Sequence, residues 1–354
     1  MGVYHLMGLG RSPGTVIGPV TYLAHRYGRW NADDQRFFAR SGEVRQRQAG
    51  QKVGDVQALV LFTTPEVLSG QVAAFDYVDN PPGRITTAPQ MPPEPMKQVL
   101  RRLLRREWPA IRGGRTAGTV FWCEVDRRDI RTTYERVVRV IAALASVGGQ
   151  GKEKWANLTG GNNVINAALE LAAMLSGDVA RLYYVQAENP DAEKCVRFTD
   201  ENGYWVDLPV MPLALGRLRQ TILDVLSDHG PLSLEDLFSF LQSEYWDLTR
   251  GLTSEEVLRN EYLAPLWKQG LIAEAEGGYD VGPQWELIRP YQEALQKARE
   301  ANLTIEALAQ QEPWLEKEEL PLAACRRGNW DRLSIDQYES SVDDNHGSSN
   351  PIHA

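Results

Sequence analysis

Short apolar runs alternate with helical patterns over roughly the first 210 residues. The apolar runs have strand length and occupy residues 3–9, 55–62, 119–125, 154–158 and 180–185. Between them, apolar residues recur at helical spacing over 15–27, 96–108, 132–147 and 164–175. This alternation predicts an α/β domain with a Rossmann-like, mostly parallel sheet and helices on both faces. Ligands of such sheets bind beyond the carboxyl ends of the strands.

The pattern changes after the proline-containing segment 209–213. Residues 215–228, 233–243 and 254–269 predict three helices, and 271–281, with Gly277 and Gly278 at its centre, predicts a β-hairpin. Three helices followed by a hairpin are typical of a winged helix-turn-helix. A further hairpin is expected over 195–208 and a further helix over 291–310. We therefore expect three parts: a ligand-binding domain (1–210), a winged helix-turn-helix with a helical extension (211–312), and a C-terminal extension (313–354) that is disordered from about residue 331.

Charge is divided unevenly along the chain. Residues 1–150 hold 21 Lys and Arg against 13 Asp and Glu, whereas the remainder holds 17 against 34. The basic first part favours an anionic ligand; the alternative is that helices such as 96–108 merely expose solvated arginines. The three cysteines and five histidines are scattered, so neither a disulfide framework nor a metal site is expected, and no cofactor is implied. With no signal peptide or membrane span expected, we predict a cytoplasmic protein.

The segment AsnLeuThrGlyGlyAsnAsn (157–163) lies between an expected strand and an apolar helix. Gly160 and Gly161 allow the backbone to approach a ligand closely. The helix that begins near Asn163 directs backbone N–H groups and its positive dipole end at an anion. Thr159, Asn162 and Asn163 add a hydroxyl and two amides as candidate ligand contacts. The alternative is a tight turn whose asparagines only cap the helix.

GlyLeuGlyArgSerProGly (8–14) is the matching segment after the first strand. It lacks the third glycine of the dinucleotide fingerprint, so a nicotinamide-dependent dehydrogenase is poorly supported. Gly10, Arg11, Ser12 and Pro13 remain as candidate phosphate or ribose contacts, with a capped turn as the alternative. After the second strand, Thr63 and Thr64 are further candidate ligand contacts. They precede Pro65, which is typical of a helix start.

These three segments in order, each at a strand end, resemble the CARF (CRISPR-associated Rossmann fold) family, whose members sense the cyclic oligoadenylate of type III CRISPR defence. The resemblance covers about residues 1–210, and the family also places a winged helix after this domain. It implies a homodimer that binds cyclic oligoadenylate, with cyclic tetra-adenylate as the first candidate ring, across its two-fold axis. Each subunit would contribute Arg11, Ser12, Thr159, Gly160, Gly161 and Asn162 to the ligand.

One departure from the family bears on catalysis. Many relatives have Gly-Gly-Thr-Lys where this chain has Gly161, Asn162 and Asn163, so the lysine that assists ring cleavage in some members is missing. Cleavage without metal would then use Arg11 for charge stabilisation and Ser12 to position the ribose. No histidine follows an arginine at the spacing that HEPN ribonucleases need. His5 lies within the first strand and is expected in the core rather than as a base.

The expected winged helix is acidic. Residues 217–289 contain six basic and thirteen acidic residues, a balance that repels DNA phosphates. We therefore expect it to serve in dimerisation or protein contact. The alternative function is a ligand-controlled transcription regulator that acts through this winged helix, and a third alternative is an unrelated nucleotide-binding enzyme.

Overall fold

The computed structural model describes residues 3–38, 56–74, 77–81, 84–85, 91–108, 117–145, 153–210 and 215–322. Residues 211–213 of the predicted boundary segment 209–213, and the tail predicted to be disordered from about residue 331, lie outside these residues. Among the described helices, none is long and apolar enough to cross a membrane.

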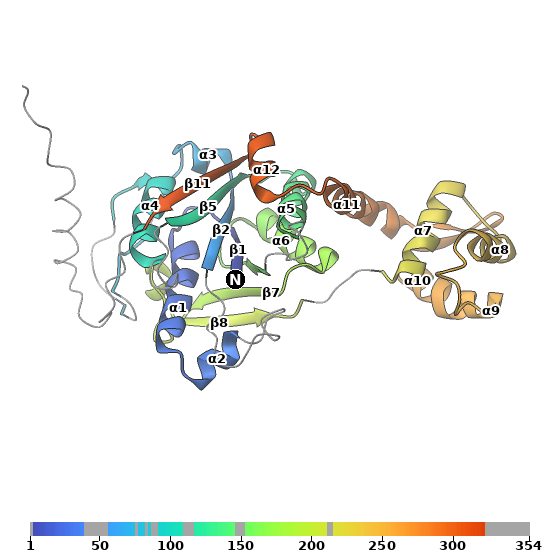
Figure 1. Cartoon of the computed structure of the whole chain (residues 1–354), viewed down its shortest axis with the longest axis horizontal. Coiled ribbons are helices and arrows are strands. Elements are labelled where there is room, and N and C mark those ends of the chain that lie inside the picture. Colours follow the sequence, from blue (N-terminus) through green and yellow to red (C-terminus); the bar gives the residue numbers. More distant parts are fainter. Residues whose placement is uncertain are drawn as a thin grey trace, which may run out of the picture.

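A seven-stranded sheet forms the centre of the molecule (Figure 1), with the order β11-β5-β2-β1-β6-β7-β8. The strands from β5 to β7 in this order run parallel, whereas β11 and β8 pair antiparallel to β5 and β7 at the two edges. The mostly parallel α/β sheet expected from the sequence is thereby confirmed. The strands are β1 (Val3–Gly8), β2 (Val56–Thr63), β5 (Ala117–Glu124), β6 (Glu153–Asn157), β7 (Arg181–Ala187), β8 (Gly203–Leu208) and β11 (Leu315–Pro321). A separate two-stranded pair joins β3 (Ala73–Ala74) to β4 (Glu94–Pro95).

Helices cover both faces of the sheet and enclose two separate apolar cores. One face packs against α1 (Gly14–Arg29), α2 (Ala32–Phe38) and α4 (Met96–Glu107). The other packs against α5 (Ile130–Ala145), α6 (Asn163–Ser176) and α12 (Ile305–Gln311), together with part of α11 (Pro283–Glu300). A short helix, α3 (Pro65–Leu68), follows β2, and a 3-10 turn (Ala192–Lys194) follows β7. Central strands buried on both faces explain their continuous apolar sequences.

A third core holds the helices and hairpin that follow the sheet (Figure 1). Its helical elements are α7 (Arg217–His229), α8 (Leu234–Glu244), α9 (Glu255–Val257), a π-helical segment (Leu258–Leu263) and α10 (Ala264–Lys268). β9 (Ile272–Ala275) and β10 (Gly278–Val281) form the antiparallel hairpin. Ser233 and Ser254 cap the second and third helical stretches, as Ser side chains at helix starts commonly do. We call residues 217–281 the helical unit.

Helix α11 belongs to two cores at once. Trp285, near its start, is buried in the core of the helical unit, whereas Leu295 and Ala298 are buried against α5 and the sheet. Figure 1 shows α11 as the segment that runs between the two parts. The expected single helix over 291–310 is wrong, because Asn302 adopts a positive φ of 46° and Thr304 caps the separate α12.

The expected hairpin over 195–208 is also wrong, since only β8 is a strand and it pairs with β7. Residues 194–197 bond instead to residues 78–80. Asn80 accepts a hydrogen bond from the Arg197 backbone N–H at 3.0 Å, and its own amide donates to the Arg197 carbonyl at 3.0 Å. The buried Glu107 carboxylate accepts from the Arg197 guanidinium at 2.7 Å. Side-chain partners distant in the sequence therefore override the local turn signal.

Strand β11 was not expected from the sequence, which placed residues 313–354 in an extension. Its four central residues are charged, and β-propensity gives little signal in such a segment. Helix α4 supplies the partners: Lys97 lies 2.7 Å from Glu316, and Arg101 lies 2.6 Å from Glu318. The Trp122 indole also donates to Glu318 at 2.8 Å. Residues 315–321 are thus part of the sheet.

Candidate functional site

The sheet reverses its strand order between β1 and β6. The chain builds β2 and β5 on one side of β1, and then crosses to the other side to form β6 and β7. Helix α1, which follows β1, packs on one face, whereas α6, which follows β6, packs on the opposite face. The two connecting loops, 8–14 and 157–163, therefore start at the same carboxyl edge and lead to opposite faces of the sheet. Open α/β sheets bind their ligands at such an edge.

The two loops are in backbone contact. A Cβ atom on Gly8 would lie 2.5 Å from the Gly160 carbonyl oxygen, and one on Gly160 would lie 2.4 Å from the Thr15 Cβ. Gly161 has a φ of 91°, which side chains rarely adopt. Glycine at positions 8 and 160 is therefore required for this close approach. The prediction that the loops lie on the same edge of the sheet is confirmed.

Asn157, the last residue of β6, joins the two loops and was not among the predicted site residues. Its side chain is fully buried. The amide donates to the Thr15 carbonyl at 3.2 Å, and the amide oxygen accepts from the Thr159 N–H at 2.8 Å and the Thr159 hydroxyl at 2.5 Å. The available signal was an asparagine at the end of an apolar strand, where a buried polar group needs partners nearby.

Two of the predicted ligand contacts, Thr63 and Thr159, bond to neighbouring strand ends through their hydroxyls. The Thr159 hydroxyl donates to Asn157 and accepts from the Val185 N–H at 2.8 Å. Thr63 is fully buried, and its hydroxyl donates to the Leu9 carbonyl at 2.9 Å. Both hydroxyls hold neighbouring strand ends together, and contact of these two residues with the ligand stays a prediction. They are positioning residues.

The first turns of α1 and α6 carry no acidic side chain. Pro13 precedes α1 without a side-chain cap, and Asn162 caps α6 by accepting a hydrogen bond from the Ile165 N–H at 2.9 Å. The capping interpretation of Asn162 is thereby confirmed. No carboxylate in either first turn opposes the positive ends of these helix dipoles, which favours an anion between them.

The remaining predicted residues lie on the rim of this edge. Arg11 and Asn163 are exposed, whereas Gly10, Ser12 and Gly161 are half-buried and Gly160 is buried. The Ser12 carbonyl accepts from the Thr15 hydroxyl at 2.9 Å, which fixes the turn into α1. The structure brings together the residues of 10–13 and 160–163, and they offer backbone groups, one guanidinium and amides to a ligand.

The loop after β2 presents different chemistry from its neighbours. Thr64 precedes α3, and a hydrogen bond from its hydroxyl, followed by weaker effects of neighbouring groups, holds the pKa of Glu66 below its usual range. Arg127, in the loop after β5, lies 3.8 Å from Glu66. The Thr64 hydroxyl thus contacts the Glu66 carboxylate, and its contact with a ligand stays a prediction.

Four of the five basic residues of α4 form ion pairs within the chain. Besides the bonds of Lys97 and Arg101 to β11, Arg102 lies 2.7 Å from Glu94, and Arg106 lies 2.8 Å from Asp79. These ion pairs account for much of the positive charge on this helix. The 8–14 motif places Arg11 at the carboxyl ends of β1 and β6, which we call the β1–β6 edge.

His5 is fully buried in β1, and its Nδ1 forms a 2.8 Å hydrogen bond with the Tyr183 hydroxyl. Burial, reinforced by the nearby Arg181 guanidinium, lowers the pKa of His5 to about 3. The imidazole is therefore neutral near pH 7 and has no access to a ligand. Its assignment to the core is confirmed. Among the described residues, no three His, Cys, Asp or Glu side chains group as a metal site would require.

No family model matches the chain. An uncharacterized protein of Archaeoglobus fulgidus is 23% identical over 261 residues, which cover 69% of this chain and 79% of that protein. Among solved structures, the chain is similar to Enterococcus italicus Csm6 bound to cyclic hexa-2'-fluoro-hexa-dAMP, with 11% identity and a TM-score of 0.33. That similarity covers 88% of this chain, which spans 62% of the length of the Csm6 chain. The fold assignment rests on the order and direction of this chain's own strands.

Proposed function

We propose that the sheet domain binds a cyclic oligoadenylate at the β1–β6 edge, as the resemblance to CARF proteins implies. The observation that carries the proposal is the contact between the loops at Gly8 and Gly160, which places the first turns of α1 and α6 at one edge. Two helix N-termini without acidic first turns suit a ligand with several phosphates. Contacts would come from residues 10–13 and 160–163, whereas Thr63 and Thr159 hold the loops in place.

The active species in this proposal is a homodimer. A cyclic ligand repeats the same phosphate and base, so two copies of one edge related by a two-fold axis would present matching groups to it. Each subunit would place Arg11 and the Gly160–Gly161 backbone against the ring. The exposed position of Arg11 supports a contact with phosphate at the outer rim of the loop.

Ring cleavage is the finer part of the proposal. A ribose 2′-OH would attack its adjacent phosphorus, lose its proton, form the P–O2′ bond and break the P–O5′ bond. The leaving 5′ oxygen would take up a proton, giving a 2′,3′-cyclic phosphate and a 5′-OH. Arg11 would stabilise the added negative charge, and Ser12 would orient the ribose. His5 takes no part, since it is buried and neutral.

The helical unit favours a second candidate function, a ligand-controlled transcription regulator. Three helices followed by a hairpin are the elements of a winged helix. Its excess of acidic residues opposes DNA binding, and its exposed aromatic side chains favour a protein contact instead. Trp246 is 59% exposed and Trp267 is 54% exposed. We therefore propose dimerisation or protein contact for this unit and keep the regulator as the alternative.

Binding and cleavage are tested together by titrating full-length protein into labelled cyclic tetra-adenylate and cyclic hexa-adenylate, with linear tetra-adenylate as the control. Light scattering with and without ligand measures the oligomeric state. We expect tight binding of one ring by a dimer, and any cleavage should persist in EDTA. Equal affinity for the linear and cyclic forms, or no binding of either ring, would contradict the proposal. Tight binding with an intact ring after hours would leave a sensor without nuclease activity.

A further inference from the structure

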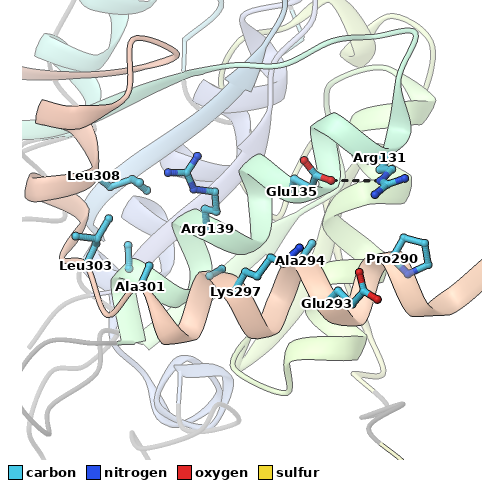
Figure 2. A pocket seen from close by; sticks show the side chains of 12 residues that line it. Arg131, Glu135, Arg139, Pro290, Glu293, Ala294, Lys297, Ala301, Leu303 and Leu308 are labelled. Carbon is cyan, nitrogen blue, oxygen red and sulfur yellow. Dashed lines mark hydrogen bonds and ion pairs between the residues drawn. The ribbon is translucent and has the colours of Figure 1, made fainter. Parts of the chain in front are cut away.

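A cavity of about 340 Å³ lies between α5, α11 and α12, outside the loops discussed above (Figure 2). One wall is a stripe of α5 at every fourth residue, from Arg131 through Glu135 and Arg139 to Ala143. The facing wall of α11 carries three alanines, Ala294, Ala298 and Ala301. Leu303 and Leu308 close one end. Small side chains on α11 leave open a space that larger ones would fill, and its volume is that of a small-molecule site.

The charges at the cavity do not cancel completely. Arg131 bonds Glu135 at 3.3 Å, Arg289 lies 3.5 Å from Glu293, and Arg139 bonds Glu312. Each lining carboxylate therefore already has an arginine. Lys297 also lines the cavity, and among the described residues no carboxylate pairs with its ammonium group. Figure 2 shows Lys297 among the lining residues between α11 and α5.

We propose that this cavity binds a small organic monoanion with an apolar body, such as a medium-chain carboxylate. The alanines and leucines would contact the apolar part, and Lys297 would pair with the carboxylate. One net positive charge beside an apolar floor matches one negative charge on an apolar ligand. This site is independent of the β1–β6 edge and does not rest on the function proposed for it.

Occupancy would have a structural consequence, because the cavity lies where α11 passes from one core to the other. A ligand held between α5 and α11 would fix α11 on the sheet domain and with it the orientation of the helical unit. A ligand that binds only the folded form raises the melting temperature by an amount that grows with the logarithm of its concentration relative to its Kd. The site can therefore be detected without knowing the natural ligand.

The test measures the melting temperature of full-length protein with octanoate, using 1-octanol and octylamine as neutral and cationic controls. We expect octanoate to raise Tm by about 5 °C at a hundredfold excess over its Kd, and the controls to have little effect. Lys297→Gln should weaken octanoate binding about tenfold. Lys268→Gln, in the helical unit, is the matched control and should leave it unchanged.

A second variant fills the space. Ala294→Leu should abolish the octanoate effect while leaving the basal Tm equal or higher, since its side chain occupies the cavity. Equal shifts from octanoate and 1-octanol, an unchanged affinity in Lys297→Gln, or no shift with octanoate would each overturn the proposal. A raised basal Tm in Ala294→Leu without any octanoate effect in wild type would identify the cavity as a packing defect.

Discussion

The contact between the two glycine loops can be tested by Gly160→Ala. The added Cβ would lie 2.4 Å from both the Cβ and the Oγ1 of Thr15, and 2.6 Å from the Gly8 carbonyl oxygen. Carbon atoms in contact are normally about 3.5–4.0 Å apart, so one loop must move by about 1 Å. The hydroxyl of Thr15 is bonded to Ser12, which restricts rotation of its side chain out of the way. Relief of the clash therefore moves backbone.

Overpacking of this kind costs about 1–3 kcal/mol of unfolding free energy. Gly160→Ala should lower the urea midpoint accordingly and weaken cyclic oligoadenylate binding by about tenfold or more, because separated loops cannot both contact one ligand. Gly28→Ala is the control, since it lies in the exposed last turn of α1 with nothing within 4 Å of its Cβ position. It should be neutral or stabilising by about 0.5–1 kcal/mol. Wild-type stability and affinity in Gly160→Ala would refute the contact.

Three further predictions concern charge. Glu318→Gln should reduce the unfolding free energy by about 1–3 kcal/mol in a urea titration, because Arg101 and Trp122 both donate to this carboxylate. Burial alone would raise the pKa of Glu318, but these bonds hold it below its usual range. The carboxylate therefore stabilises the fold near neutral pH, and this contribution is lost as the pH falls below about 4. Glu318→Gln should not show that loss. Arg11→Ala should slow any single-turnover ring cleavage about 100-fold at saturation, measured on labelled cyclic tetra-adenylate; an unchanged rate would restrict Arg11 to binding. Full-length protein should show no nanomolar duplex DNA binding by fluorescence anisotropy at physiological salt, and steeply salt-dependent binding would instead favour the regulator.

Sequence patterns located the central elements because each signal was local. Pro65 marks the start of α3, and continuous apolar runs mark strands covered on both faces. Strand β11 could not be found in this way, since its Glu316 and Glu318 are accommodated only by Lys97 and Arg101, more than 200 residues earlier. The same limit explains the erroneous hairpin at 195–208, where the distant Asn80 determines the backbone conformation.

At the candidate site, the sequence predicted which loops meet but not what each side chain does. The position of a loop follows from strand direction and order, which the strand–helix alternation indicates. The direction in which a threonine hydroxyl points does not follow from that alternation. The Thr159 hydroxyl forms hydrogen bonds with Asn157 and the Val185 backbone, and the Thr63 hydroxyl bonds to the Leu9 carbonyl. The motifs themselves imply none of these partners.

The position of β11 at the end of the described chain constrains the order in which the sheet can form. Strand β5 pairs on one side with β2, which precedes it, but on its other side with β11, and the bond from Trp122 to Glu318 spans 196 residues. During synthesis, β5 must therefore remain an open edge until the entire helical unit has been made. An unpaired strand edge readily recruits other chains. The slowest and most aggregation-prone stage of folding is thus expected to be this late closure, rather than assembly of the strands around β1.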